Sequence, residues 1–331
     1  MYFRGLTLVA AMFILFSYGK AETGSPVGET MNETVTFATH AADADDLYWA
    51  LVMAESLREF GGALAGAPIR IYLDDAAPEL DTMFAGHRDS LGVTIKHSQT
   101  PPGIRKVVYS SKVYAAATAE REAAEQGGIV AWLDPDVVFV KEPSAFRLDS
   151  GVVLGYRPVQ LLNISSRYQD PLNAFWSRLY FLLGVADSMT FRMTTTTDLV
   201  EIRPHFNAGM LIVRPEHGIL RAWPLALEKL FEDSIIQRMC AEDRKTAIFL
   251  HQAAMAGVIL AMVSQRQMKD LPESYNYALM FADRLTPARR PASLDDLVMF
   301  RHDLAFADSA RRATVTDPSK IFKWVKERWP K

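Results

Sequence analysis

Apolar residues follow two different periods along the first half of the chain, which predicts strands and helices in turn. Residues 34–39 (TVTFAT) are typical of a strand because β-branched side chains dominate them. Apolar residues between 47 and 57 recur at spacings of three and four, which predicts an amphipathic helix ending at Gly61. The same criteria place further strands at 69–73, 93–97, 129–133, 152–156 and 210–213, and further helices at 78–85, 110–123, 219–231 and 245–262.

This alternation predicts an α/β fold with a mostly parallel central sheet and helices on both faces. Ligands of such sheets collect at the carboxyl ends of the strands, so residues that directly follow strands are the candidates for chemistry. No stretch rich in proline, glycine or serine separates the two halves. Residues 34–331 are therefore expected to form a single domain.

The N-terminal segment predicts export. Arg4 precedes an uncharged, mostly apolar run over residues 5–18, and small residues follow it. Residues 1–21 are expected to be a signal peptide, and residues 22–33 a linker. The expected location is a secretory lumen, the extracellular space or a periplasm. An uncleaved signal-anchor, which would hold the protein in a membrane, is the alternative.

Composition narrows the classes of function. The net charge of -3 and the pI near 6.2 give no support for a nucleic-acid partner, and basic residues are scattered along the 331 positions. The single cysteine, Cys240, excludes an internal disulfide.

Residues 129–140 (IVAWLDPDVVFV) would suit a buried strand except for Asp134 and Asp136. An ionised carboxylate in such surroundings costs several kcal/mol unless a positive charge pairs with it. No lysine or arginine lies within the run, whereas Mg²⁺ and Mn²⁺ readily bind one or two carboxylates. Pro135 fixes the backbone between the two acids. A plain Asp-Pro-Asp turn with solvated acids is the alternative.

Five segments in a fixed order carry a resemblance to a known family. They are WLDPDVVFV, HFNAGMLIVRP, FLHQAAMAGVIL, LPESYNY and FRHD. Together they resemble glycosyltransferases of the GT-A fold, above all the retaining glycogenin-like and galactosyltransferase-like enzymes of family 8. The resemblance covers most of residues 34–303. It implies transfer of a sugar, with retention, from a nucleotide-sugar donor to a hydroxyl group of a carbohydrate, protein or lipid acceptor.

The resemblance also implies a metal site that holds Mn²⁺ or Mg²⁺ against the donor's diphosphate. Asp136 would bind the metal directly, and Asp134 would bind it and contact the donor ribose. His302, which follows an apolar strand, would be the third ligand. A surface histidine is the alternative for His302.

Further roles carry over to residues near the reacting sugar. Gln252 takes the position under the reacting carbon, and Asn207 and Gly209 match the family's Asn-Ala-Gly segment. An amide can bond sugar hydroxyls, and a glycine lets a ligand approach the backbone closely. Lys112 would offset diphosphate charge. A tight turn around Asn207 and a solvated Lys112 are the alternatives.

Thr39 and His40 match the place where the family holds the nucleotide base. His251 stands where the family has a carboxylate that contacts the sugar. The segment after His302 also lacks the family's diphosphate-binding glycine and lysine, for which Arg311 or Arg312 could substitute. These departures motivate a second hypothesis, a GT-A-fold protein that binds a sugar or nucleotide without catalysis.

Overall fold

The computed structural model of the protein describes residues 33–306 and 317–329. The predicted signal peptide over residues 1–21, nearly all of the predicted linker, and both Arg311 and Arg312 lie outside the described residues. The described residues belong to one compact unit.

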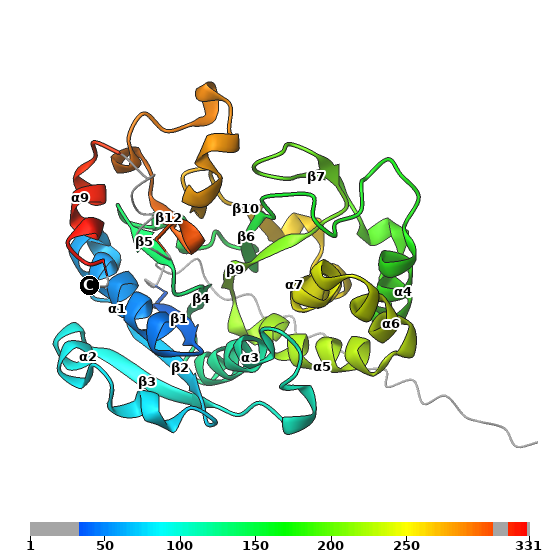
Figure 1. The fold of residues 1–331 in the computed structure, drawn as a ribbon, viewed down its shortest axis with the longest axis horizontal. Helices are drawn as coiled ribbons and strands as arrows, with labels where there is room; N and C mark the ends of the chain where they lie inside the picture. The colour runs from blue at the N-terminus through cyan, green and yellow to red at the C-terminus, as the bar shows by residue number, and fades with distance from the viewer. Residues whose placement is uncertain (1–32, 307–316, 330–331) are drawn as a thin grey trace, which may run out of the picture. The chain divides into compact units, whose positions relative to one another are not determined.

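The centre of the fold is a seven-stranded sheet in the order β10-β6-β9-β4-β1-β2-β3 (Figure 1). Its strands are β1 (Val35–Ala41), β2 (Ile69–Asp74), β3 (Val93–Ser98), β4 (Ile129–Leu133), β6 (Leu154–Pro158), β9 (Phe206–Val213) and β10 (Met268–Asp270). β9 runs antiparallel to both of its neighbours, and the other pairs are parallel. The predicted α/β class with a mostly parallel sheet is confirmed.

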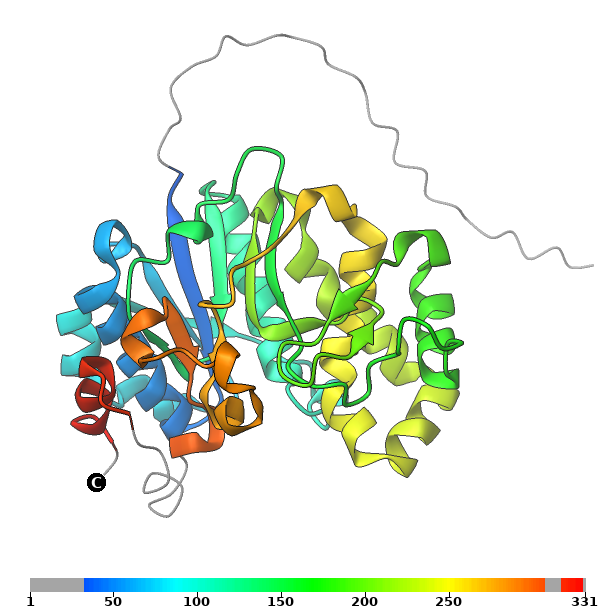
Figure 2. The ribbon, with the colours of Figure 1, turned by 90° about the horizontal axis from the view of Figure 1, so that it is seen from above.

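Helices cover both faces of this sheet, as the views in Figures 1 and 2 agree. Side chains of β4 alternate between the faces: Val130 and Trp132 pack in the core on the α3 side, whereas Ala131 and Leu133 pack in the core on the α1 side. The helices are α1 (Ala44–Phe60), α2 (Ala85–Leu91), α3 (Ser110–Ala124), α4 (Ala174–Leu183), α5 (Ile219–Glu232), α6 (Ser234–Glu242), α7 (Arg244–Met262) and α9 (Lys320–Lys326).

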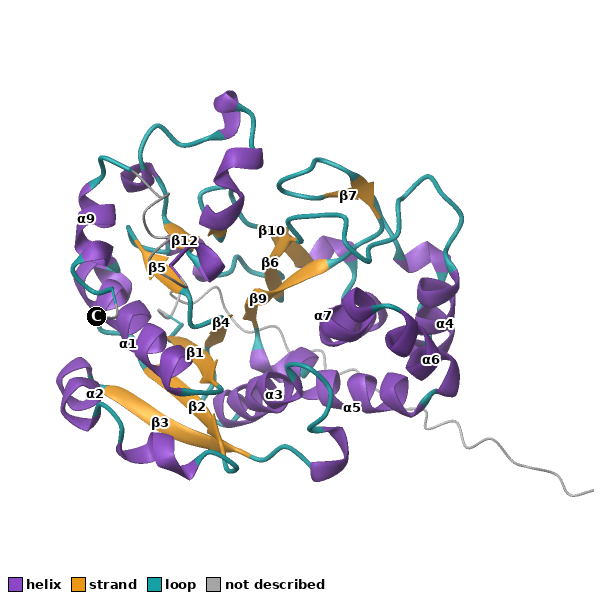
Figure 3. Cartoon of the chain, in the orientation of Figure 1, coloured by secondary structure: helices purple, strands orange, loops and turns teal. Residues whose placement is uncertain are grey.

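A second, three-stranded sheet positions the site. Its order is β11 (Tyr277–Ala278), β12 (Met299–Arg301) and β5 (Val137–Phe139). Figure 3 labels two of these strands, β12 and β5, beside each other. β12 pairs antiparallel with β5, with Arg301 opposite Val137. This pairing carries residues 301–303 to the turn that holds the two carboxylates. A short hairpin of β7 (Met193–Thr194) and β8 (Glu201–Ile202) forms the third sheet.

The structure differs from the predicted elements in a few places. β9 begins at Phe206, so Asn207 and Gly209 lie inside a strand rather than in a turn before one. The reason is that β9 pairs with β4 over residues 210–213 and with β6 both over residues 211–213 and at Phe206. The predicted helix 78–85 is a 3-10 helix, η2 (Pro78–Thr82), followed by α2. Helices α4 and α6 were not predicted.

Helix α7 carries His251 and Gln252 and packs in the core. Among the described residues it alone is long and apolar enough to cross a membrane, but 67% of its apolar window is buried inside the protein. Burial of this extent is typical of the core helix of a globular protein. Asp243 caps α7, because its side chain accepts hydrogen bonds from the backbone N–H groups of Lys245 and Thr246.

Replacing Asp243 tests how much this N-cap contributes to the free energy of unfolding. We expect Asp243→Ala to lower the free energy of unfolding by about 1 kcal/mol, since the first N–H groups of α7 lose their acceptor. Urea denaturation followed by circular dichroism measures the change. Asp170→Ala, at an exposed loop position, is the matched control. Equal unfolding free energies for Asp243→Ala and the control would contradict the capping role.

Candidate active site

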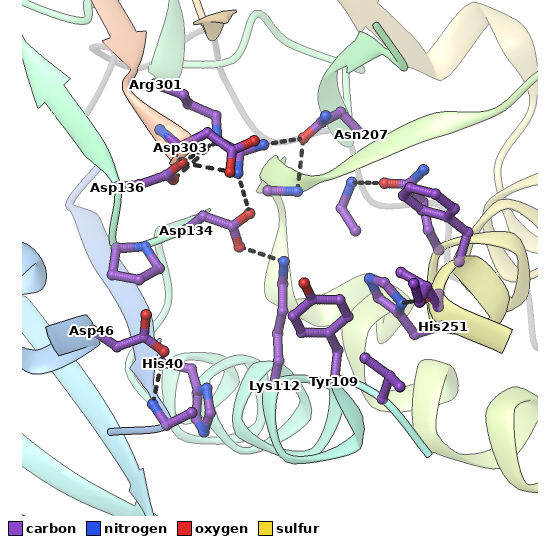
Figure 4. A pocket seen from close by; sticks show the side chains of 18 of the residues that line it. His40, Asp46, Tyr109, Lys112, Asp134, Asp136, Asn207, His251, Arg301 and Asp303 are labelled. Carbon is purple, nitrogen blue, oxygen red and sulfur yellow. Dashed lines mark hydrogen bonds and ion pairs between the residues drawn. The ribbon is translucent and has the colours of Figure 1, made fainter. Parts of the chain in front are cut away.

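Nine of the ten predicted site residues line one cavity of about 760 Å³. They are His40, Lys112, Asp134, Asp136, Asn207, Gly209, His251, Gln252 and His302. The cavity lies where β1, β4 and the start of β9 meet α3, α7 and the end of β12 (Figure 4). Residues as far apart in sequence as His40 and His302 are thus brought together, as ligand binding at the strand ends of an α/β sheet predicts.

Thr39 is the exception. It was predicted to hold the nucleotide base, but its side chain does not reach the cavity. Thr39 and His40 are neighbours within β1, so their side chains point to opposite faces of the sheet. His40 reaches the cavity, whereas Thr39 is fully buried and does not line it.

Asp134 lies between two cations. It follows β4, and its backbone N–H donates to the Gly209 carbonyl of β9 at 2.9 Å, which fixes the start of the turn. One carboxylate oxygen forms an ion pair with the Lys112 ammonium from the first turn of α3. The other lies 2.9 Å from the Arg301 guanidinium (Figure 4).

Asp136 forms a bidentate ion pair with Arg301. Arg301 Nε donates to Asp136 Oδ1 at 3.0 Å, and Arg301 Nη2 donates to Asp136 Oδ2 at 3.1 Å. The backbone N–H of Asp303 also donates to Asp136 Oδ2, at 3.0 Å. A guanidinium that donates in parallel to a carboxylate is among the strongest polar contacts in proteins.

The charges of this cluster stabilise one another. Burial opposes ionisation of Asp134, but the nearby Lys112 and Arg301 outweigh it and lower the pKa of the carboxyl. Burial likewise opposes the charge on Arg301, and the neighbouring Asp136 and Asp134 raise its pKa instead. Asp134 and Arg301 are therefore charged at neutral pH, and together with Lys112 and Asp136 they form a network of two carboxyl groups and two basic side chains.

The predicted metal site does not fit this arrangement. Every oxygen of Asp134 and Asp136 already accepts from Lys112, Arg301 or a backbone N–H. A dication held by both carboxylates would lie close to the guanidinium, and at 4 Å the repulsion is roughly 4 kcal/mol per unit of charge. Across residues 33–306 and 317–329, no group of three or more His, Cys, Asp or Glu side chains is placed to hold a metal ion.

His302 also departs from its predicted role. Its ring packs against Trp49, with ring centroids 4.0 Å apart, and stacks on Phe306 at 4.9 Å. Only 3% of the residue is exposed, and burial lowers its pKa to about 4, so the imidazole is neutral. Arg301 and His302 are neighbours at the end of β12, so they point in different directions and Arg301 takes the side of the carboxylates.

Hydrogen bonds to its amide group orient Asn207, near the start of β9. The Asn207 Nδ2 amide donates to Gln160 Oε1 at 2.8 Å, and Asn207 Oδ1 accepts from the Gly209 N–H at 2.8 Å. Arg301 Nη1 makes a long contact, 3.5 Å, to the same oxygen. Asn207 is therefore held in one orientation between the cation cluster and the remainder of the cavity.

A buried chain of side chains orients Gln252. Gln252 Oε1 accepts from the Ala208 N–H at 3.1 Å, so its Nε2 faces His205 Nε2 at 3.3 Å. Since His205 Nε2 must accept this contact, His205 Nδ1 carries the proton and donates to Ser165 Oγ at 2.7 Å. Burial lowers the pKa of His205 to about 3, which keeps the imidazole neutral and suited to this chain.

His251 lies on the adjacent wall of the cavity. Its ring contacts Tyr109 at 4.7 Å between centroids, and its Nδ1 lies 2.9 Å from the Ile248 carbonyl. Burial, aided by the charge of Lys112, lowers its pKa to about 3. The position that the family fills with a carboxylate thus carries a neutral imidazole here. Tyr109 has a positive φ of 63°, which is rare for an aromatic residue, and it is 51% exposed at the cavity.

Sequence reasoning missed Arg301 and His205, the two residues that organise the site. A signal for Arg301 was present in the FRHD segment, because strand alternation lets only one of Arg301 and His302 face the carboxylates. His205 stands directly before the FNAG segment, but its contact with Gln252 depends on the packing of α7 against β9.

The fold and the site together define a glycosyltransferase of the GT-A fold. Residues 41–262 match the family model of the Rhodobacterales glycosyltransferase domain, and the chain belongs to this family. The resemblance to GT-A glycosyltransferases found in the sequence is thereby confirmed, and the matched residues form a glycosyltransferase domain. No curated protein matches the chain.

One solved glycosyltransferase structure shares the fold, and further ones are similar to the chain. The apo structure of the bifunctional glycosyltransferase WbbM is similar with a TM-score of 0.51 and 12% identity, over 83% of this chain and 47% of WbbM. This protein thus spans about half the length of WbbM. Galactosyltransferase LgtC, in complex with donor and acceptor sugar analogues, is similar with a TM-score of 0.42 and 14% identity, over 87% of this chain and 99% of LgtC. GlyE of Streptococcus pneumoniae is similar with a TM-score of 0.44 and 12% identity, over 90% of this chain and 60% of GlyE.

Proposed function

We propose that this protein transfers a sugar from a nucleotide-diphosphate sugar to a hydroxyl group of a carbohydrate, protein or lipid acceptor. The observation that carries the proposal is the convergence of two cations, Lys112 and Arg301, with oriented amides of Asn207 and Gln252 on one cavity. Cations suit the diphosphate, and amides suit the hydroxyl groups of a sugar.

In the proposed reaction the bond between the sugar's anomeric carbon and the diphosphate oxygen breaks, and the diphosphate leaves with the electron pair. The acceptor oxygen forms the new bond to the anomeric carbon, and its proton passes to the departing phosphate. Lys112 and Arg301 stabilise the charge that develops on the leaving group, since fixed donors act most strongly in a site shielded from water. Gln252, held by Ala208 and His205, orients the sugar.

Retention of configuration at the anomeric carbon is proposed from the resemblance to family 8, and proton NMR of the product decides it. Export by residues 1–21, or anchoring through them, is likewise a proposal. It rests on the charge and hydropathy of that segment.

The test is consumption of a panel of UDP-, GDP-, ADP- and dTDP-sugars, assayed with Mn²⁺ and with EDTA. We expect wild-type protein to release nucleoside diphosphate from one of them, and Gln252→Ala to do so at least ~10-fold more slowly because the amide no longer positions the sugar. Gln237→Ala, at an exposed position of α6, is the matched control and is expected to keep the wild-type rate. Equal rates for wild type and Gln252→Ala would reject the role of Gln252, and no release from any donor would reject the function.

A further inference from the structure

Basic side chains of the protein itself form ion pairs with Asp134 and Asp136. Residues 129–140 contain no basic residue, but the fold brings Lys112 to one side of Asp134 and Arg301 to the space between the two acids (Figure 4). These side chains are largely but not fully buried: Lys112 is 12% exposed, Arg301 14%, and each aspartate 15%. The charge requirement that predicted a metal ion is thus met by two side chains.

Arg301 is locked in this position from several directions. Four of its contacts go to the aspartates, and its Nη1 donates to Asn207 Oδ1 at 3.5 Å. A methyl group at Gly209 would lie 2.7 Å from Arg301 Nη1 and 2.3 Å from Asp134 Oδ2, so the glycine leaves the space that the ion pair occupies. The packing around Gly209 therefore holds the Arg301 guanidinium in a defined position within the site.

Both cations keep donors for a ligand. An ammonium has three N–H donors, of which Lys112 uses one on Asp134. Among the described residues, the hydrogen bond of the Arg301 Nη1 nitrogen is the long one, 3.5 Å, to Asn207 Oδ1. Both residues line the cavity. A guanidinium and an ammonium held side by side are suited to phosphate oxygens, which a planar fork and a point charge bind in complementary ways.

We propose that Arg301, together with Lys112, takes the place of a divalent metal, so that this glycosyltransferase binds the donor's diphosphate without a metal ion. The inference rests on the proposed use of a nucleotide-diphosphate donor. The two aspartates then serve as positioning residues that hold the cations, rather than as metal ligands. His302 belongs to the aromatic packing with Trp49 and Phe306.

Calorimetric titration of the full chain tests the inference. The probes are UDP, GDP, ADP, dTDP and inorganic pyrophosphate, each first in EDTA and then with Mn²⁺. We expect at least one nucleoside diphosphate to bind in EDTA, and Mn²⁺ to change its dissociation constant less than threefold. Arg301→Ala is expected to weaken this binding at least tenfold in EDTA. Arg192→Ala is the matched control, because Arg192 is 57% exposed and does not line the cavity.

Arg301→Lys covers the case in which Arg301→Ala does not fold, since it keeps the charge and loses the planar fork. We expect it to weaken binding in EDTA by a smaller factor than Arg301→Ala. Wild-type binding that needs Mn²⁺, or that Mn²⁺ tightens tenfold or more, would overturn the inference and leave the proposed function standing. Failure of every nucleoside diphosphate to bind, with or without Mn²⁺, would instead overturn the proposed function.

Discussion

Gly209→Ala is expected to reduce sugar transfer at least ~100-fold while the protein stays folded. Gly209 lies in β9, where its backbone carbonyl accepts from the Asp134 N–H and its own N–H donates to Asn207. A Cβ at this position would approach Asp134 Oδ2 to 2.3 Å and Arg301 Nη1 to 2.7 Å. Neither side chain can yield without losing its partners, so the network of carboxylates and cations must separate. A loss of ~100-fold corresponds to about 2.7 kcal/mol of transition-state stabilisation.

Gly103→Ala is the matched control for this substitution. Gly103 has no atom within 4 Å of the position of an added Cβ, and it lies outside the cavity. We expect it to keep the wild-type rate of release of nucleoside diphosphate. Thermal melting of both variants separates a local effect from unfolding, since overpacking by one methyl group costs about 1–3 kcal/mol. Near wild-type transfer by Gly209→Ala would show that the close packing of Asp134 against Arg301 is not needed for activity.

The free energy of unfolding is expected to fall steeply as pH decreases from 6.5 towards 4. Burial lowers the pKa of His205 and of His251 to about 3, and the pKa of His40 and of His302 to about 4. The unfolded chain binds a proton at each of these residues near pH 6.5, whereas the folded protein does not. Protons therefore favour the unfolded state throughout this window, and the stability present above pH 6.5 is lost on acidification.

Three carboxyl groups oppose this trend. Burial raises the pKa of Asp46 to about 6, so the folded protein binds that proton first and gains stability as pH falls through 6. Four histidines less one aspartate leave about three protons near pH 5, or at most about 4 kcal/mol per pH unit. Glu120 and Asp270, whose pKa values burial also raises, reduce the slope further.

Urea denaturation at a series of pH values between 5 and 7.5 measures this slope. His205→Gln is the informative variant, because glutamine can still accept from Gln252 but cannot take up a proton in this range. We expect it to reduce the slope by about one proton, or about 1.4 kcal/mol per pH unit. A stability that is flat between pH 7 and pH 5 in the wild-type protein would contradict the assignment of neutral, buried imidazoles.

Much of the candidate site could be predicted from short segments of the chain. Strand periodicity located β1 and the end of β4, which Asp134 follows directly, and the resemblance added His40. The resemblance supplied Gln252, which the packing of α7 brings to Ala208 of β9. Thr39 was misplaced because the end of β1 was set two residues too early, which hid the alternation of Thr39 with His40. A metal ion was inferred because residues 129–140 contain no lysine or arginine, and basic residues elsewhere in the chain were not considered as partners of the two aspartates.

The sequence by itself determined the α/β class and the demand of Asp134 and Asp136 for positive charge, because periodicity and local composition record which residues are buried. The order of five short segments indicated the family. Only the tertiary structure decided how that demand is met. Arg301 lies 165 residues beyond Asp136 and reaches it through the pairing of β12 with β5. Strand pairing at this separation depends on the packing of the whole sheet, and no local pattern encodes it.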